Sequence, residues 1–491
     1  MNTSPMPAPI PDRRRWIALV VLCLAQFMIT LDTTVVNVAL PAIQRDLHFS
    51  ETGLTWIVNA FLVTFGSFLL LAGRLGDLFG RRRVLLIGVG VFTTASVLCG
   101  IAPNQGLLIA ARLAQGVGAA MQAAVILAII ATEFTEVTER ARAMSAYVFV
   151  SVSGAALGLL AGAVLTESLS WHWIFLINLP IGLATIILAR ALIPADRGLG
   201  REHGVDWLGS TLVTASVMTA VYAIVQASTY GWGSSEVLGF AALAAALMGA
   251  FLTVEARIEN PMIPLRVLWL PGLIGSSFVR GLLGTALYTT FFLGTLYFEH
   301  VLHYTAVQTG LAFLPWFVTL GILSVGVTAR LVERFGPMPV LVAGLGAVVA
   351  GLALFASAGV HANFFPTIMV ANFAVGAGIG AAMIPLLTIA MADVPAEDRG
   401  LGSAITTVFQ QVGGALGLAV LSTIATNHSR SLQTQGDSVA GSLVSGYHLA
   451  FVLSAATIGV AIVTALIVLR PRPVGLEAES EPAPELEPQA A

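Results

Sequence analysis

The feature that most constrains this chain is a succession of long apolar segments separated by short charged loops. A helix needs about 20 residues to cross the ~30 Å hydrocarbon core of a bilayer. Only 10% of the 491 residues are charged, whereas soluble domains carry about a quarter. The chain therefore cannot cover a water-facing surface of its own size. We predict an all-α integral membrane protein whose fourteen transmembrane helices occupy residues 16–40, 54–75, 84–102, 106–131, 142–165, 172–193, 206–227, 236–256, 270–298, 308–331, 338–359, 364–391, 402–425 and 447–469.

The placement of arginine predicts the orientation of these helices. All 23 basic residues are arginine; 19 of them lie in segments on one side, with Arg45 and Arg430 on the other and Arg112 and Arg280 within spans. Cytoplasmic loops carry an excess of basic residues. We therefore expect a multi-pass protein of the cytoplasmic (inner) membrane with both termini in the cytoplasm.

An internal repeat divides the chain into two halves. Arg74-Leu-Gly-Asp-Leu-Phe-Gly80 recurs as Arg330-Leu-Val-Glu-Arg-Phe-Gly336, at an offset of 256 residues, and Gly118-Ala-Ala-Met121 recurs as Gly380-Ala-Ala-Met383, at an offset of 262. Parallel repeats of this kind are typical of transporters that rock two bundles about a central site. The expected organisation is a cytoplasmic N-terminus at 1–15, a six-helix bundle at 16–195, a two-helix insert at 196–262, a second six-helix bundle at 263–470 and a disordered acidic, proline-rich cytoplasmic tail at 471–491.

The loop between the second and third spans has the pattern of a conformational switch. Gly73 and Gly80 permit a tight turn where helices approach closely. Asp77 lies at a helix end among arginines, including Arg81 and Arg82, and can make charge-assisted contacts that form in one conformation and break in another. A simple positive-inside anchor explains the arginines, but it explains neither Asp77 nor the spaced glycines. We call residues 73–83 the gating loop.

Four segments carry a resemblance to a known family. The gating loop resembles the signature of the major facilitator superfamily, with Gly76 in place of an alanine and Leu78 in place of the first arginine. Three further segments resemble span motifs of the fourteen-span drug–proton antiporters of the EmrB/QacA type, namely 31–41 (LDTTVVNVALP), 112–120 (RLAQGVGAA) and 173–182 (WIFLINLPIG). The resemblance implies the major facilitator fold of two six-helix bundles, here with two inserted helices.

The fifth span departs from the antiporter signature of that family. Gly154, Gly158 and Gly162 keep the four-residue glycine spacing, while Leu159 stands where the signature has proline. Glycines at this spacing allow helices to pack closely in lipid. We therefore interpret them as a helix-packing motif, and expect a weaker kink than the proline would give.

Two opposite charges lie at matched depth inside predicted spans. Asp32 is about 8 residues, or ~12 Å, from the outer end of the first span, and Arg112 is about 6 residues, or ~9 Å, from the outer end of the fourth. A charge near the bilayer centre costs at least ~2.5–3.5 kcal/mol, so it needs a partner or a role. Burial favours the neutral carboxyl and a nearby arginine favours the carboxylate. We expect Asp32 to be the protonation site and Arg112 to modulate it; a static ion pair that fixes helix register is the alternative.

Other polar residues at mid-span are weaker candidates. Arg280 either reaches toward the cytoplasm, which we favour, or lines a cavity. Candidate cavity-lining residues more often only link helices by hydrogen bonds; they are Asn37, Asn59, Gln122, Asn372 and Gln410.

Enzyme chemistry has no support in the sequence. A phosphate-binding Gly-x-x-x-x-Gly-Lys-Ser/Thr loop, a Cys-x-x-Cys pair and a His-Glu-x-x-His motif are all missing, and two cysteines cannot form a metal cluster. A net charge of −3 does not indicate nucleic acid as a partner. We therefore expect no cofactor, no metal and no ATP-driven pumping.

The residues and the resemblance together predict transport driven by a proton gradient. The resemblance implies an antiporter that exchanges an inbound proton for an outbound hydrophobic or cationic small molecule, as in multidrug or antibiotic efflux. A dedicated metabolite exporter or a proton-coupled uptake carrier on the same scaffold is the first alternative. A non-transporting scaffold or receptor is more distant, because it would not require Asp32 and Arg112 at matched depth.

Overall fold

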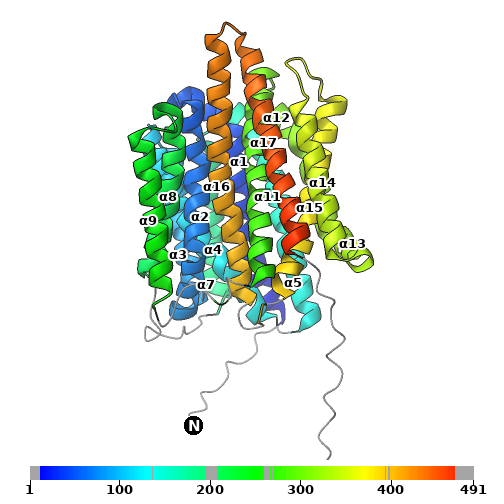
Figure 1. Cartoon of the computed structure of the whole chain (residues 1–491). Coiled ribbons are helices and arrows are strands. Elements are labelled where there is room, and N and C mark those ends of the chain that lie inside the picture. The colour runs from blue at the N-terminus through cyan, green and yellow to red at the C-terminus, as the bar shows by residue number, and fades with distance from the viewer. Residues whose placement is uncertain are drawn as a thin grey trace, which may run out of the picture.

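The computed structural model describes residues 12–134, 136–194, 207–258, 266, 270–392, 394–395 and 399–469. Within these residues every regular element is a helix and no strand occurs. The helices stand side by side, and α1 begins and α17 ends at the same end of the molecule (Figure 1). The predicted all-α membrane fold is thereby confirmed, while the predicted tail at 471–491 lies outside the described residues.

The first group of helices forms the N-terminal bundle. Its members are α1 (Asp12–Leu47), α2 (Glu51–Phe79), α3 (Arg81–Gly100), α4 (Gln105–Glu133), α5 (Val137–Ser168), α6 (Trp173–Leu176) and α7 (Asn178–Leu192). Two helices follow as a hairpin, α8 (Trp207–Tyr230) and α9 (Ser235–Glu255); α8 packs on α2 and α16, and α9 packs on α8.

The remaining helices form the C-terminal bundle. They are α11 (Pro271–Leu296) with its π-helical end η2 (Tyr297–Val301), α12 (Ala306–Ile322), η3 (Leu323–Val327), α13 (Thr328–Phe335), α14 (Pro337–Ala356), η4 (Phe364–Ile368), α15 (Met369–Ala392), α16 (Arg399–Thr434) and α17 (Val439–Val468).

Local sequence signals explain where several helices begin and end. Ser50 and Asn104 place side-chain oxygens on free backbone N–H groups at the starts of α2 and α4, and Thr305 does so at the start of α12. Gly80 has φ of 95° between α2 and α3, and Gly336 has φ of 81° between α13 and α14. These positive angles favour glycine, which explains why both copies of the repeated loop end on this residue.

Each predicted span coincides with a helix or with consecutive helical segments of the structure. Twelve helices in the described residues are long and apolar enough to cross a membrane, and the apolar parts of α8 and α12 are shorter, at 211–224 and 306–322. The count of fourteen spans therefore stays a prediction. The largest difference is at the hairpin of α16 and α17, where α16 has 36 residues, or ~54 Å, and rises with α17 above the other helices (Figure 1).

The internal repeat is visible in two equivalent helix contacts, α4 on α3 and α15 on α14. A β-carbon added to Gly118 would lie 2.8 Å from the carbonyl oxygen of Gly88 in α3, and one added to Gly378 would lie 2.5 Å from that of Gly344 in α14. Gly88 and Gly344 are 256 residues apart, whereas Gly118 and Gly378 are 260 apart. The equivalent of Gly118 is thus Gly378, and the register of 262 expected from Gly380 was wrong by two residues, because short sequence matches do not fix helix rotation.

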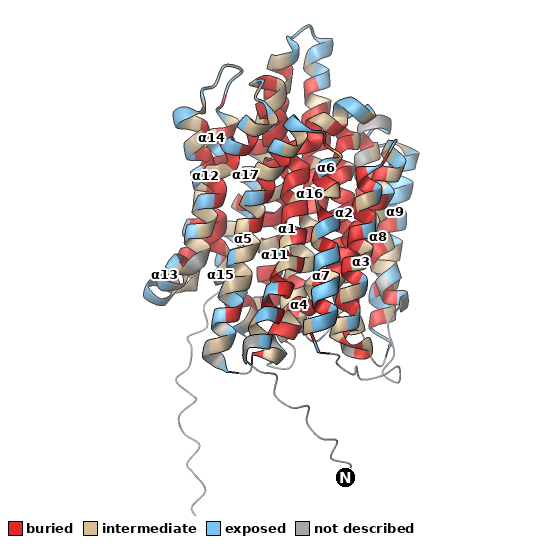
Figure 2. Ribbon diagram, turned by 180° about the vertical axis from the view of Figure 1, so that it is seen from behind, coloured by how far each residue is buried: buried red, intermediate tan, exposed pale blue. Residues whose placement is uncertain are grey.

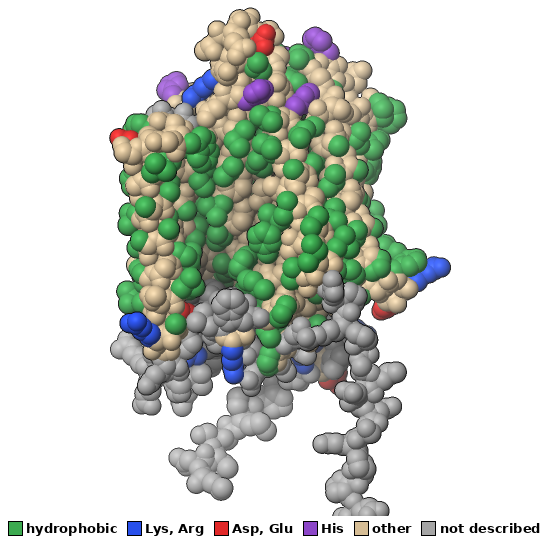
Figure 3. Space-filling model, in the orientation of Figure 1, with side chains coloured by type: hydrophobic (Ala, Val, Ile, Leu, Met, Phe, Trp, Pro, Cys, Tyr) green, Lys and Arg blue, Asp and Glu red, His purple; other side chains and the backbone are tan. Residues whose placement is uncertain are grey.

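Burial follows the expected pattern for a protein in lipid. Buried residues concentrate at the centre of the molecule, and exposed and intermediate residues lie at its periphery (Figure 2). Hydrophobic side chains cover its sides, while arginine side chains gather mainly toward the end at which α1 begins (Figure 3). The exposed surface includes large apolar residues such as Leu183, Ile187 and Val463, at 50%, 65% and 54% exposure. Such a surface fits a hydrocarbon solvent, where apolar exposure carries no penalty.

Candidate functional site

Asp32 and Arg112 form an ion pair inside the N-terminal bundle. Arg112 Nη1 lies 2.5 Å from Asp32 Oδ2, and the two side chains are 2% and 0% exposed. α1 and α4 bring them together at matched depth, as the sequence predicts. The structure therefore supplies the partner that a charge in the membrane requires.

A glutamine that sequence reasoning missed joins the pair to the rest of the bundle. Gln115 Nε2 donates to Asp32 Oδ1 and to Ser96 Oγ, both at 2.7 Å, and Gln115 Oε1 accepts from Arg112 Nη1 at 2.7 Å. Both oxygens of the Asp32 carboxylate are thus engaged. The spacing could have revealed Gln115, because residues i and i+3 of a helix share a face.

Arg112 is also held by α2 and by aromatic rings. Its Nε donates to the carbonyl oxygen of Ile57 at 2.9 Å. Its guanidinium carbon lies 4.5 Å from the ring centre of Phe61 and 5.9 Å from that of Phe175. Hydrogen bonds on both sides and rings around it make the pair a closed polar cluster in an apolar bundle. Adding one proton to the carboxylate would remove the charge that holds the cluster together.

The glycines of α5 pack against the part of α1 that carries Asp32. A β-carbon on Gly158 would lie 2.9 Å from the carbonyl oxygen of Leu31, and one on Gly162 would lie 3.0 Å from the backbone of Val35. A β-carbon on Gly154 would lie 3.0 Å from the ring of Phe27. These distances show the close helix approach expected of a helix-packing motif.

The gating loop ties neighbouring ends of three helices together. Arg81 Nη1 donates to the carbonyl oxygen of Ala128 in α4 at 3.2 Å, and Arg82 Nη2 donates to that of Arg190 in α7 at 2.6 Å. The side chain of Asp77 lies outside the described residues. A β-carbon on Gly73 would meet nothing within 4 Å, so close approach does not explain this glycine.

Most of the predicted cavity-lining residues are buried within a bundle. Asn37 donates to the backbone of its own helix at 2.7 Å, as does Asn372 at 3.0 Å, while Gln122 donates to α3 and α4 backbone oxygens at 3.4 and 3.2 Å. Neither amide atom of Asn59 has a hydrogen-bond partner among the described residues. These four are at most 5% exposed, so the structure does not place them on a cavity wall. Gln410 alone is partly accessible.

Arg280 is held by the neighbouring helix α16. Its Nε donates to Gln410 Oε1 at 2.8 Å and its Nη1 donates to Thr406 Oγ1 at 3.0 Å. Both partners lie on α16. Two acceptors on the neighbouring helix thus hold the guanidinium within the protein, and the choice between a side chain that reaches toward the membrane surface and one that lines a cavity stays a prediction.

Three side chains combine a deep position with accessible surface. Tyr147, Arg280 and Tyr288 lie deep among protein atoms, yet each keeps an intermediate accessible surface. From this combination we infer an internal space between the two bundles. Tyr147 OH donates to Gln26 Oε1 at 3.0 Å and Tyr288 OH donates to Gln411 Oε1 at 2.5 Å, so the hydroxyls are engaged and the rings can face a ligand.

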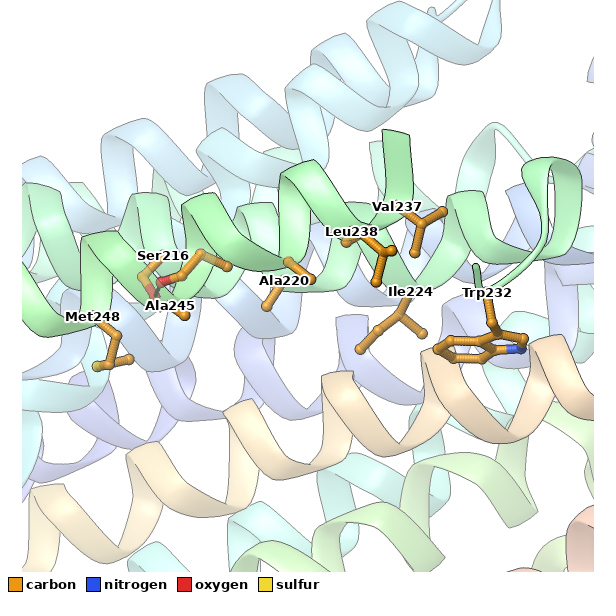
Figure 4. A pocket seen from close by; sticks show the side chains of 11 residues that line it. Ser216, Ala220, Ile224, Trp232, Val237, Leu238, Ala245 and Met248 are labelled. Carbon is orange, nitrogen blue, oxygen red and sulfur yellow. Dashed lines mark hydrogen bonds between the residues drawn. The ribbon is translucent and has the colours of Figure 1, made fainter. Parts of the chain in front are cut away.

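Two apolar grooves lie elsewhere. One, of about 420 Å³, runs between α8 and α9 and is lined by residues including Ser216, Ile224 and Trp232 (Figure 4). The other, of about 430 Å³, is lined by residues of η3, α13, α14 and α15. Neither contains Asp32, Arg112 or Arg280, so we do not assign the transport site to them.

The fold and site define a helical membrane protein of two related bundles with a buried ion pair in one of them. The model of the Major Facilitator Superfamily matches residues 22–418, with a second match at 273–490. The chain belongs to this superfamily of transporters and is a multi-pass membrane protein.

Relatives and solved structures agree with this assignment. The puromycin resistance protein pur8 of Streptomyces alboniger is 39% identical over 93% of this chain and 91% of its own length. The cephamycin export protein CmcT of Amycolatopsis lactamdurans is 35% identical over 83% and 84%. The multidrug resistance protein Stp of Mycobacterium tuberculosis is 32% identical over 84% and 76%. The crystal structure of the POT family transporter PepTSo shares the fold, with a TM-score of 0.67 at 14% identity over 92% of this chain and 98% of that one.

Proposed function

We propose that this protein exports antibiotic-like small molecules across the cytoplasmic membrane in exchange for protons, by alternating access. The proposal takes efflux from the resistance and export proteins that the chain resembles. The buried pair of Asp32 and Arg112 carries the proton-coupling part, because a proton on this enclosed carboxylate would remove the charge that joins α1 to α4. We further propose fourteen spans with both termini in the cytoplasm, on the arginine distribution.

Protonation of Asp32 would change the contacts between α1 and α4. The carboxylate accepts from Arg112 Nη1 and Gln115 Nε2, whereas a carboxylic acid carries no charge and offers its own O–H. Arg112 would keep the carbonyl of Ile57 and the amide oxygen of Gln115. One proton therefore weakens the link between α1 and α4 and leaves the bond from α4 to α2 intact.

Contacts at the outer end support a state that is closed to the outside. Thr426 Oγ1 donates to Glu51 Oε2 at 3.3 Å, which joins α16 to α2. The backbone N–H of Val307 donates to Glu167 Oε2 at 3.2 Å, which joins α12 to α5. Each bond crosses from one bundle to the other. Opening the protein outward would break both and re-form them on closure, which is the two-state behaviour that alternating access requires.

Transport in inside-out vesicles tests the proposal. The vesicles are energised by a pH gradient, acidic inside, and accumulation of a cephamycin, which carries a carboxylate, is measured for wild type, Asp32→Asn and Asp437→Asn. Asp437 is an exposed carboxylate between α16 and α17, so its variant controls for loss of one charge. We expect gradient-driven accumulation by wild type and the control, and loss in Asp32→Asn.

Other outcomes distinguish the alternatives. Accumulation by Asp32→Asn with an unchanged pH dependence would remove Asp32 as the coupling site. Failure of wild type to accumulate several antibiotics would favour a dedicated metabolite exporter or an uptake carrier, to be separated by a metabolite screen in vesicles of either orientation.

A further inference from the structure

Arg280 is a second membrane-embedded arginine that the coupling pair does not use. It lies on α11, the C-terminal counterpart of α1, and its hydrogen-bond partners are the neutral side chains of Gln410 and Thr406. No carboxylate of the described residues lies within ion-pair distance of it. In this respect Arg280 differs from Arg112, whose charge is matched by Asp32.

The internal repeat shows that the C-terminal bundle has no acid at the position equivalent to Asp32. With offsets of 256 and 260, the positions of Asp32 and Arg112 correspond to Tyr288 and Asn372. The C-terminal bundle therefore has a tyrosine where the N-terminal bundle has its carboxylate. A cation held in the membrane without an acid is expensive, and such residues mark ligand pathways.

The geometry of Arg280 leaves part of its guanidinium open. Arginine has five N–H donors. Gln410 takes the one on Nε and Thr406 takes one on Nη1, which leaves three, on Nη1 and Nη2, without a partner in the described part of the chain. Two acceptors fix the plane of the group while its outer edge stays unused. That edge matches the two oxygens of a carboxylate.

The surroundings of Arg280 fit an amphipathic ligand. Arg280 lies deep in the protein but keeps accessible surface, which leaves room for a ligand at its free N–H groups. Tyr288 lies on the same helix, close enough to Arg280 to interact with its charge, and its hydroxyl is engaged by Gln411. An aromatic ring beside a single cation favours an organic acid over a small inorganic anion.

We propose that Arg280 binds the carboxylate, or an equivalent acidic group, of the exported compound. The assignment rests on the proposed export function and names its substrate class as hydrophobic organic acids. It replaces the expectation of cationic substrates, since a fixed positive charge at the binding site repels them. Gln410 and Thr406 are positioning residues that hold the guanidinium.

Binding of two dyes that differ in one group tests the assignment. Rhodamine B carries an aromatic carboxylate, and its ethyl ester has the same ring system without that acid. Their dissociation constants for the purified protein are measured by fluorescence polarisation. We expect wild type to bind the acid about tenfold more tightly than the ester, the effect of one charge-assisted hydrogen bond. Arg280→Gln should reduce this ratio to about one, and Arg280→Lys, which keeps the charge but not the fork, should give an intermediate ratio.

Each outcome bears on the assignment, and transport separates it from the proposed function. Equal binding of the two dyes by wild type, tighter binding of the ester, or no saturable binding of the acid would overturn it, and none of these needs a folded variant. A variant ratio equal to that of wild type would also overturn it. Binding that favours the acid, without accumulation of rhodamine B in energised inside-out vesicles, would keep the site and refute proton-driven export.

Discussion

Replacing Gly158 with alanine tests whether the contact between α5 and α1 supports the coupling site. A β-carbon there would lie 2.9 Å from the carbonyl oxygen of Leu31 and 3.0 Å from its Cα, where ordinary contacts are 3.4–4 Å. The Thr34 hydroxyl is nearer still and can rotate away, but the Leu31 atoms belong to the backbone and no side-chain rotation relieves them. The two helices must separate by several tenths of an ångström along the segment that carries Asp32.

The expected loss of stability in Gly158→Ala follows from overpacking. Extra carbon in a packed interior costs about 1–3 kcal/mol, against which alanine recovers at most about 1 kcal/mol of helix propensity. We expect Gly158→Ala to lower the apparent Tm by at least a few degrees and to lower proton-driven transport. Gly459→Ala is the matched control, because Gly459 lies within α17 and a β-carbon there meets nothing within 4 Å. Its Tm should be unchanged or higher.

The assay is thermal unfolding of both variants and wild type in one detergent at one scan rate, because unfolding of membrane proteins is commonly irreversible. Vesicle transport is measured on the same preparations. Equal Tm values for Gly158→Ala and Gly459→Ala would refute the reasoning. A lower Tm with full transport would keep the packing argument and remove its link to coupling.

Three further predictions concern the ion pair and the outer contacts. Gln115→Met should destabilise the protein by about 1–3 kcal/mol, since it leaves Asp32 Oδ1 unsatisfied, and denaturation in detergent measures this. Arg112→Lys should reduce proton-driven transport at least about tenfold, because a lysine cannot bond both Asp32 and the carbonyl of Ile57 in the present geometry; transport equal to wild type would contradict this. Glu167→Gln should weaken the outer contact between α5 and α12 and increase labelling of a cysteine placed on the internal space by an external reagent, and unchanged labelling would show that this bond does not hold the outer end closed.

Much of the fold and the central pair could be predicted from sequence. Each predicted span is helical in the structure, and the depths of Asp32 and Arg112 agree with their pairing. Gln115 was missed, although its spacing from Arg112 was visible. The remaining errors concern side-chain direction. Asn59, Gln122 and other mid-span amides were expected at a cavity and are buried instead.

The sequence by itself determined that the chain folds in a lipid bilayer, how many apolar segments it has, and which charged residues must find a partner. These follow from chain length per span and from the cost of charge in hydrocarbon, which are properties of single segments. Only the tertiary structure decided which helix faces meet. It enclosed Asp32 with Arg112 and Gln115, and left Arg280 with neutral neighbours on α16. Helix rotation is set by close contacts between segments far apart in the chain, such as Gly158 on Leu31, and hydropathy carries no record of them.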